Sequence, residues 1–178
     1  MGAVNIFNPL NTIDVTDITS LNTQENERLK DVLDLFNAGV KEVRELIETT
    51  DTIAVVKCSF GKDSTVTLLM VTEAYRQSIA ENKIEKERPL LVSTVNTLGE
   101  IIAMNMFVAY CRKRLLKYGK DAGINISHEI VTPTLQDEFF VKYAGAQKFV
   151  SNSTRAGDCT IQLKLNPSEN YVKKTLHG

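Results

Sequence analysis

The fold prediction for this chain rests on residues 52–64, whose sequence is Thr52-Ile53-Ala54-Val55-Val56-Lys57-Cys58-Ser59-Phe60-Gly61-Lys62-Asp63-Ser64. The first five are uncharged and mostly β-branched, a pattern typical of a strand that is buried on both faces. The glycine predicts a turn, and the apolar spacing that follows predicts a helix. A buried strand that turns directly into a helix is the building unit of an α/β sheet.

An amphipathic helix is expected before this unit. From Asn22 to Thr49, apolar residues recur at steps of three and four, which is the period of a helix with one buried face. Gly39 lies inside the pattern and is expected to mark a bend or a break. We therefore predict an N-terminal extension over residues 1–50, made of a lead-in and this helix.

The same alternation of strand and helix continues after residue 64. Further strands are expected at 89–95 and 124–131, and a long helix over 98–118 that ends near Gly119. Gly119 and Gly123 are both expected to mark the end of this helix. Strands that alternate with helices form parallel sheets. The prediction for residues 51–178 is therefore a doubly wound, Rossmann-like, mainly parallel α/β domain.

The loop between the first strand and its helix carries groups that bind phosphate. Ligands of an open α/β sheet bind beyond the carboxyl ends of its strands. Gly61 lets the backbone approach an oxyanion, and the free amides at the start of the helix attract it. Ser59 and Ser64 add hydroxyl donors, and Lys62 adds a positive charge. Neither a Walker A loop nor a G-x-G-x-x-G fingerprint is present, and a glycine turn with a serine helix cap is the structural alternative.

The pattern S-x-G-x-D-S at residues 59–64 resembles the PP-loop of the ATP pyrophosphatases and of the PAPS reductase family. The resemblance implies an adenine nucleotide alpha hydrolase-like fold whose loop, Phe60 included, binds the β and γ phosphates of ATP. Such enzymes cleave ATP between the α and β phosphates and adenylylate a substrate. Lys62 would then stabilise charge on the leaving pyrophosphate, and Asp63 would help to place Mg²⁺ or orient the loop.

A second segment follows the expected strand at 89–95. Its sequence, Ser93-Thr94-Val95-Asn96-Thr97-Leu98-Gly99-Glu100, is similar to the S-T-D-T-L-x-E segment of the DndC family of DNA phosphorothioation sulfurtransferases. The likeness implies that Asn96 and Thr97 contact the adenosine. Asn96 stands where that family has aspartate, and an amide offers a metal no negative charge.

Two later segments extend the resemblance. Residues 132–145 resemble a T-P then D-S-F-W-V stretch, and residues 159–167 resemble a C-T-x-x-L-K-x-x-P signature. In the family the second signature returns a lysine and a cysteine to the active site. That implies phosphate binding by Lys164, with Arg155 nearby, and a role for Cys159 as sulfur carrier or cluster ligand.

The resemblance implies an ATP pyrophosphatase and sulfurtransferase of the PAPS reductase family that acts in DNA phosphorothioate modification. Its cofactors would be ATP and Mg²⁺, and its partners DNA, a cysteine desulfurase and other phosphorothioation proteins. DndC-type proteins carry further cysteines downstream, so residues 51–178 are expected to lack a cluster-binding portion, and a [4Fe–4S] cluster would need ligands from elsewhere. A PAPS or APS reductase and a catalytically inactive nucleotide-sensing module are the alternatives.

Composition excludes several other classes. The 178 residues carry 21 Lys and Arg against 22 Asp and Glu, a balance that disfavours binding of nucleic acid by bulk charge. Three cysteines without a C-x-x-C pair and two histidines predict no disulfide framework and no self-contained metal centre. No secretory signal or membrane-spanning run is evident, so a cytoplasmic protein without a membrane partner is expected. The basic run at 112–120 is expected to be a solvated face, with a phosphate-binding patch as the alternative.

Overall fold

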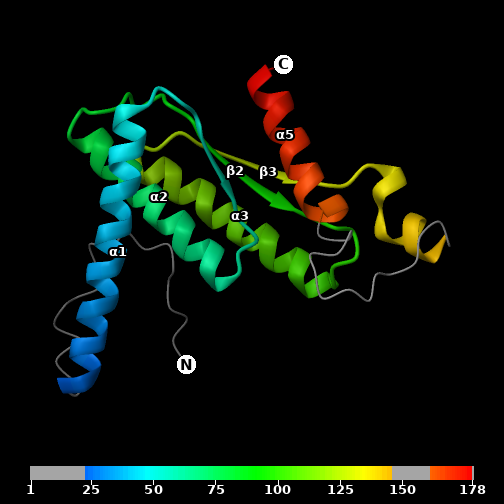
Figure 1. Ribbon diagram of the computed structural model, residues 1–178, viewed down its shortest axis with the longest axis horizontal. Coiled ribbons are helices and arrows are strands. Elements are labelled where there is room, and N and C mark those ends of the chain that lie inside the picture. The colour runs from blue at the N-terminus through cyan, green and yellow to red at the C-terminus, as the bar shows by residue number, and fades with distance from the viewer. Residues whose placement is uncertain (1–22, 146–160, 178) are drawn as a thin grey trace. The chain divides into compact units, whose positions relative to one another are not determined.

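A computed structural model describes residues 23–145 and 161–177 of the chain (Figure 1). Helices and strands alternate through the first part, and short helical turns precede the last helix. The elements are α1 Thr23–Thr49, β1 Ala54–Lys57, α2 Lys62–Ala80, β2 Leu90–Val95, α3 Ile102–Ala122, β3 Ile126–Val131, η3 Leu135–Asp137, η4 Phe140–Ala144, η5 Ile161–Leu165 and α5 Asn166–His177.

The strands form one parallel three-stranded sheet in the order β1-β2-β3. The prediction of an α/β fold is therefore confirmed. From one edge of the sheet to the other, the strands follow their order in the sequence. The part of the chain that the structure describes contains no strand on the other side of β1. Within the same part, no helix is both long and apolar enough to cross a membrane.

Gly39, which was expected to interrupt a helix, and Gly119, which was expected to end one, lie inside continuous helices. A Cβ added at Gly39 of α1 would stand 2.9 Å from the Sδ of Met70, and one at Gly119 of α3 would stand 3.0 Å from Cγ1 of Ile126. These glycines are therefore explained by close packing rather than by helix breaking. The helix α3 ends at Ala122, directly before Gly123, as expected for that glycine, whose positive φ of 70° is typical of the residue after a helix.

The described residues form two compact units. The first contains the described residues up to Ala54 together with Val66–Leu90 and Lys113–Ile126. Its core is apolar, and Ala74 and Tyr75 of α2 are completely buried. Arg88 closes the end of α1 by donating hydrogen bonds to the carbonyl oxygens of Ile47 and Thr50, each at 2.7 Å.

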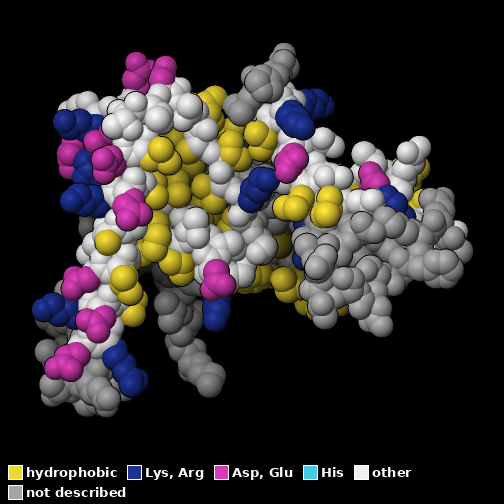
Figure 2. Space-filling view, viewed as in Figure 1, with side chains coloured by type: hydrophobic (Ala, Val, Ile, Leu, Met, Phe, Trp, Pro, Cys, Tyr) yellow, Lys and Arg dark blue, Asp and Glu magenta, His cyan; other side chains and the backbone are white. Residues whose placement is uncertain are grey.

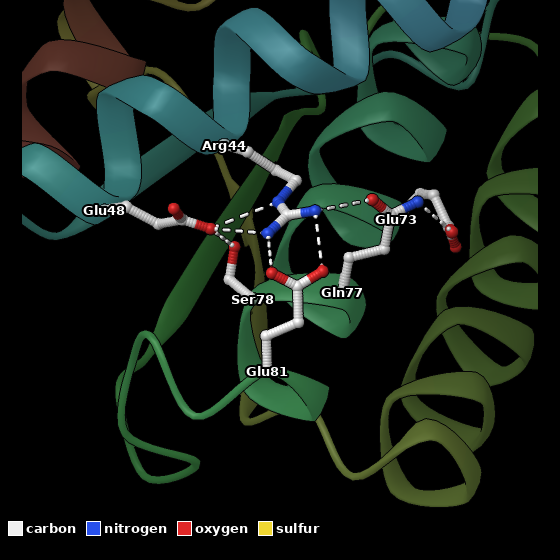
Figure 3. Close-up of polar contacts among 6 residues, drawn as sticks. All are labelled: Arg44, Glu48, Glu73, Gln77, Ser78 and Glu81. Carbon is white, nitrogen blue, oxygen red and sulfur yellow. Dashed lines mark hydrogen bonds and ion pairs between the residues drawn. The ribbon is translucent and has the colours of Figure 1, made fainter.

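Arg44 of α1 is the centre of a polar network in the first unit (Figure 3). Its guanidinium bonds Glu48 of the same helix at 3.0 Å and Gln77 of α2 at 3.1 Å, and it also pairs with Glu81. Glu48 accepts a further hydrogen bond from Ser78 at 2.7 Å. In the N-terminal half of α1, by contrast, charged and apolar side chains lie on an exposed surface (Figure 2). The network therefore ties the C-terminal half of α1 to α2.

The second unit contains Val55–Thr65, Leu91–Arg112 and the described residues from Ser127 onward. It holds most of the sheet, whose ladder is extended past β1 by a 2.8 Å hydrogen bond from the amide of Cys58 to the carbonyl of Ser93. The strand β2 is buried along nearly its whole length, as its uncharged sequence predicts. The carboxyl ends of the strands therefore lie together in this unit.

Candidate functional site

The loop after β1 is held by its own hydroxyl groups. The amide of Gly61 donates to Ser59 Oγ at 3.4 Å, and the hydroxyls of Ser59 and Ser64 lie 3.1 Å apart. Ser64 Oγ also donates to the carbonyl oxygen of Gly61 at 3.1 Å. The same carbonyl oxygen accepts the first helical hydrogen bond of α2, from the amide of Thr65. The predicted phosphate donors thus shape the loop before any ligand is present.

A cleft of 590 Å³ opens beside this loop, entirely within the second unit. Its walls come from the loop, the second half of β2 and the turn after it, the first half of α3, β3, the end of η5 and the first turn of α5. The predicted site residues that line it are Ser59, Phe60, Gly61, Asn96 and Lys164. Four other predicted residues, Lys62, Asp63, Ser64 and Thr97, are not among its lining residues. Arg155 and Cys159 lie outside the described residues.

The lining of the cleft includes both apolar and polar residues. Val95, Val108, Ile130 and Leu165 contribute aliphatic surface, which suits a flat ring system. Lys164 and the loop contribute charge and hydrogen-bond donors. The arrangement can therefore bind a ligand that has an apolar or aromatic part and an anionic part.

The turn after β2 uses the side chain of Asn96 for its own structure. Asn96 Oδ1 accepts a hydrogen bond from the amide of Leu98 at 2.9 Å, and Leu98 has a positive φ of 61°. The sequence predicted a helix from residue 98, but a left-handed residue cannot continue a helix, so α3 begins at Ile102. The hydroxyl of the buried Thr97 donates to Glu100 Oε1 at 3.1 Å, and so Thr97 positions the turn.

The cleft also contains residues to which the sequence analysis assigned no role. Glu100 is an acidic side chain among its lining residues, and Ser93 and Ser168 line it while being only 1% exposed. The hydroxyl oxygens of both serines are buried and have no hydrogen-bond partner within residues 23–145 and 161–177, an arrangement that costs roughly 1–3 kcal/mol for each group. A serine four residues after Lys164 falls on the same helix face, and this spacing is the signal that would have indicated Ser168.

His128 of β3 lies beneath the loop. Its Nε2 is 2.9 Å from the hydroxyl of Thr94, which donates its single proton to the carbonyl of Cys58 at 2.7 Å. His128 must therefore be protonated on Nε2 to donate to Thr94, which leaves Nδ1 as a buried acceptor without a partner among the described residues. Burial, and then the charge of Arg112, lower the pKa of His128 to about 4, so the ring is neutral near pH 7.

The described cysteines have no catalytic features. Cys58 and Cys111 are buried free thiols, and loss of hydration raises the pKa of each. A raised pKa disfavours the reactive thiolate. Residues 23–145 and 161–177 contain no group of three or more His, Cys, Asp or Glu side chains placed to hold a metal ion. Two buried thiols do not fit an iron–sulfur cluster, which needs four ligands.

In the segment after β3 that resembles the T-P then D-S-F-W-V stretch, the polar side chains bond one another and stabilise the local structure. Asp137 accepts hydrogen bonds from Thr134 at 2.8 Å and from Lys142 at 2.6 Å, and these bonds lower the pKa of its carboxyl group. Phe140 is 61% exposed and therefore does not belong to the core. Asp137 fastens two short helical turns together.

The basic run at 112–120 also differs from a uniformly solvated face. Arg112 is half-buried and donates to the carbonyl oxygen of His128 at 3.3 Å, whereas Lys117 is exposed and pairs with Asp121 at 2.7 Å.

Comparison with protein-family models, with curated proteins and with solved structures found no match to this chain.

Proposed function

We propose that this chain is a nucleotide-binding enzyme of the ATP pyrophosphatase type, with the doubly wound fold of the adenine nucleotide alpha hydrolases. One observation carries the proposal. The cleft brings the loop residues Ser59 and Gly61 together with Asn96 and Lys164, which come from distant segments that resemble the motifs of that family. Predicted site residues from three separate segments of the sequence thus line one cavity.

In the proposed complex the anionic end of the nucleotide meets the loop and Lys164. The loop offers backbone amides at the start of α2, and Lys164 offers a charge that pairs with phosphate oxygens. The aliphatic residues of the cleft accommodate the base, and the amide group of Asn96 hydrogen-bonds the adenosine. Lys62 and Asp63 begin α2 beside the loop, where they act on the pyrophosphate from outside the cleft wall.

The proposed reaction is adenylylation. An oxygen of the acceptor attacks the α phosphorus of ATP, the bond between that phosphorus and the bridging oxygen breaks, and pyrophosphate leaves with the electron pair. Donors that are already placed around the leaving group stabilise its growing charge. The acceptor is a phosphate of DNA in the cytoplasm, and a cysteine desulfurase supplies the sulfur that later replaces the adenylyl group.

Magnesium fits the cleft only as a companion of the nucleotide. Mg²⁺ is commonly bound through one or two carboxylates together with substrate phosphates. Among the described residues that line the cleft, Glu100 is the acidic one, so it would be the protein group for such an ion. Magnesium bound there would neutralise charge on the phosphates. Any iron–sulfur cluster would require ligands from outside the described residues.

A nucleotide-sensing module that binds without turnover is the second candidate function. It is favoured by Asn96, whose carbonyl oxygen is engaged by the amide of Leu98 and which provides no carboxylate at that position. Release of pyrophosphate from ATP would exclude a pure sensor, and preference for PAPS over ATP would instead indicate a reductase.

The test is calorimetric titration with Mg–ATP and, separately, with PAPS. Lys164→Ala should weaken Mg–ATP binding about 10-fold to 100-fold, because one charged hydrogen bond contributes roughly 1.5–3 kcal/mol. Lys62→Ala is expected to have an effect of the same order. Lys173→Ala, an exposed lysine on α5 outside the cleft lining, is the matched control and should bind like the wild type. Equal affinities of the Lys164 and Lys173 variants would contradict the site.

A further inference from the structure

We propose that Phe60, His128 and Thr94 are positioning residues that hold the loop after β1 in its ligand-binding shape. The inference rests on the proposed function in one respect, because it takes this loop to be the part of the chain that binds the nucleotide. It assigns roles to Thr94 of β2 and His128 of β3, which the sequence did not predict as site residues. None of the three residues needs to touch a reacting atom.

The backbone of Phe60 requires an external restraint. Its φ is 57°, in the left-handed region that bulky residues rarely adopt. The ring is only 6% exposed, and its centroid lies 5.7 Å from that of His128 at an angle of 45°. Packing of the ring against the histidine therefore holds Phe60 in a conformation that its backbone disfavours.

The histidine is itself held by the loop. Its Nε2 donates to Thr94 at 2.9 Å, and Thr94 donates to the carbonyl of Cys58 at 2.7 Å. Cys58 and Phe60 are separated by one residue, and the amide of Phe60 lies 3.4 Å from the Sγ of Cys58. The contacts thus form a closed circuit, in which β2 fixes the start of the loop and β3 fixes its turn.

This circuit determines where the next amide points. Gly61 follows Phe60 directly, and its amide direction depends on the ψ angle of Phe60 and the φ angle of Gly61 itself. Gly61 also lines the cleft. If the ring of Phe60 is released, the backbone relaxes toward commoner conformations, and the amide of Gly61 no longer keeps one orientation. Loss of the clamp should therefore weaken anion binding through the changed orientation of this amide.

A double-mutant cycle on Mg–ATP affinity tests this coupling. Phe60→Gly removes the ring but leaves the left-handed backbone accessible, and it should raise the Kd at least tenfold. His128→Ala should raise it similarly in the wild-type background and by less than twofold in the Phe60→Gly background, because the histidine acts through the ring. Asn82→Gly relieves another left-handed residue, in an exposed turn of the first unit, and should leave the Kd unchanged. Equal effects of His128→Ala in both backgrounds would overturn the proposal.

Milder variants keep the test decisive if a large truncation prevents folding. Thr94→Val removes the hydroxyl at nearly constant volume and should raise the Kd, whereas Thr94→Ser keeps the hydroxyl and should restore nearly wild-type affinity. A merely structural role would predict that affinity follows the melting temperature across both variants. Affinity that tracks melting temperature instead of the hydroxyl would contradict a positioning role.

A ligand-free measurement separates this inference from the proposed function. ¹⁵N relaxation of the amide of Gly61 should show increased motion in Phe60→Gly, His128→Ala and Thr94→Val, with the amide of buried Tyr75 as reference. If the wild type binds no nucleotide but these changes appear, the proposed function fails and the positioning role stands. If Gly61 is equally ordered in all variants, the positioning role fails whatever the chain binds.

Discussion

Burial determines the charge of His128. The side chain is 3% exposed, and desolvation together with the nearby guanidinium of Arg112 disfavours the imidazolium. The neutral ring donates from Nε2 to Thr94, which is compatible with the proton that Thr94 gives to Cys58. Protonation at Nδ1 would place a charge on a buried atom that no described residue contacts through a hydrogen bond. At this scale, the chemistry of the residue depends on its neighbours rather than on its type.

This burial predicts a specific loss of stability in acid. The pKa of His128 is about 4 when the chain is folded and 6.5 in the reference state, so the unfolded chain binds the proton first as the pH falls. The free energy of unfolding is therefore unaffected by this histidine above pH 6.5. Between pH 6.5 and 4 it falls by about 3 kcal/mol in total, because the unfolded chain gains the proton that the folded chain does not bind. Denaturant unfolding as a function of pH measures the loss.

His128→Phe is the comparison for this measurement. Carboxylates also titrate at the acid end of the same range, so the expected result is a shallower fall in the free energy of unfolding between pH 6.5 and 5 for the variant. Parallel curves for the wild type and the variant would show that His128 is not responsible.

At the scale of elements, α1 is tied to α2 by charge as well as by apolar packing. Hydrogen bonds from Ser78 and Arg44 lower the pKa of Glu48, and the bond from Arg44 lowers that of Glu81. Carboxyls with lowered pKa values stabilise the fold above their unfolded pKa, and this contribution disappears as the pH falls through the folded value. The network in Figure 3 should therefore act at neutral pH and fail in acid.

Arg44→Met tests this network. We expect the variant to be less stable than the wild type at neutral pH and low salt, with the difference shrinking in 1 M salt and below pH 4, because screening and protonation remove the attraction. Arg28→Met, at an exposed position of the same helix, is the control and should change stability little. A difference that is independent of salt would indicate that only the stem of Arg44 contributes, through packing.

The two helix glycines should respond differently to alanine. In Gly119→Ala the new methyl would meet Ile126 at 3.0 Å and the carbonyl of Ile124 at 3.1 Å, and neither a β-branched carbon nor a backbone atom moves easily. We expect a loss of about 1–2 kcal/mol, since overpacking outweighs the gain in helix propensity. Thermal or denaturant unfolding measures it.

Gly39→Ala is the matched comparison for this prediction. Its methyl would meet the flexible side chain of Met70, which can turn aside, so the change should be close to neutral. Equal losses for the two variants would show that helix packing does not distinguish the sites.

For the whole molecule, the proposed function predicts that ligand binding stabilises the fold. At a concentration one hundred times the Kd, Mg–ATP should add about 2.7 kcal/mol to the free energy of unfolding. For a chain of this size that corresponds to a rise in Tm of roughly 5–10 °C. Differential scanning calorimetry measures the shift, and the Lys164→Ala variant should show a smaller one at the same concentration. An unchanged Tm at saturating Mg–ATP would contradict binding to the native state.

Fold class was predictable because the relevant signals are local. The uncharged run at 52–56 and the spacing of apolar residues in α1 and α2 each depend on neighbours in sequence, and they located the elements to within a few residues. Boundaries that depend on turn geometry were less accurate. The left-handed residue at Leu98 delays α3, and no composition rule predicts a positive φ for leucine.

The amino-acid sequence by itself determined that this chain forms an α/β sheet with a glycine turn after its first strand, because periodicity and turn chemistry act over a few residues. Only the tertiary structure decided which distant side chains share a cleft and which are used up in holding it. Lys164 and Asn96 meet the loop because the chain folds back, whereas Phe60 is engaged by His128 and Thr97 by Glu100. Such pairings depend on packing between segments far apart in the chain, and local sequence carries no record of them.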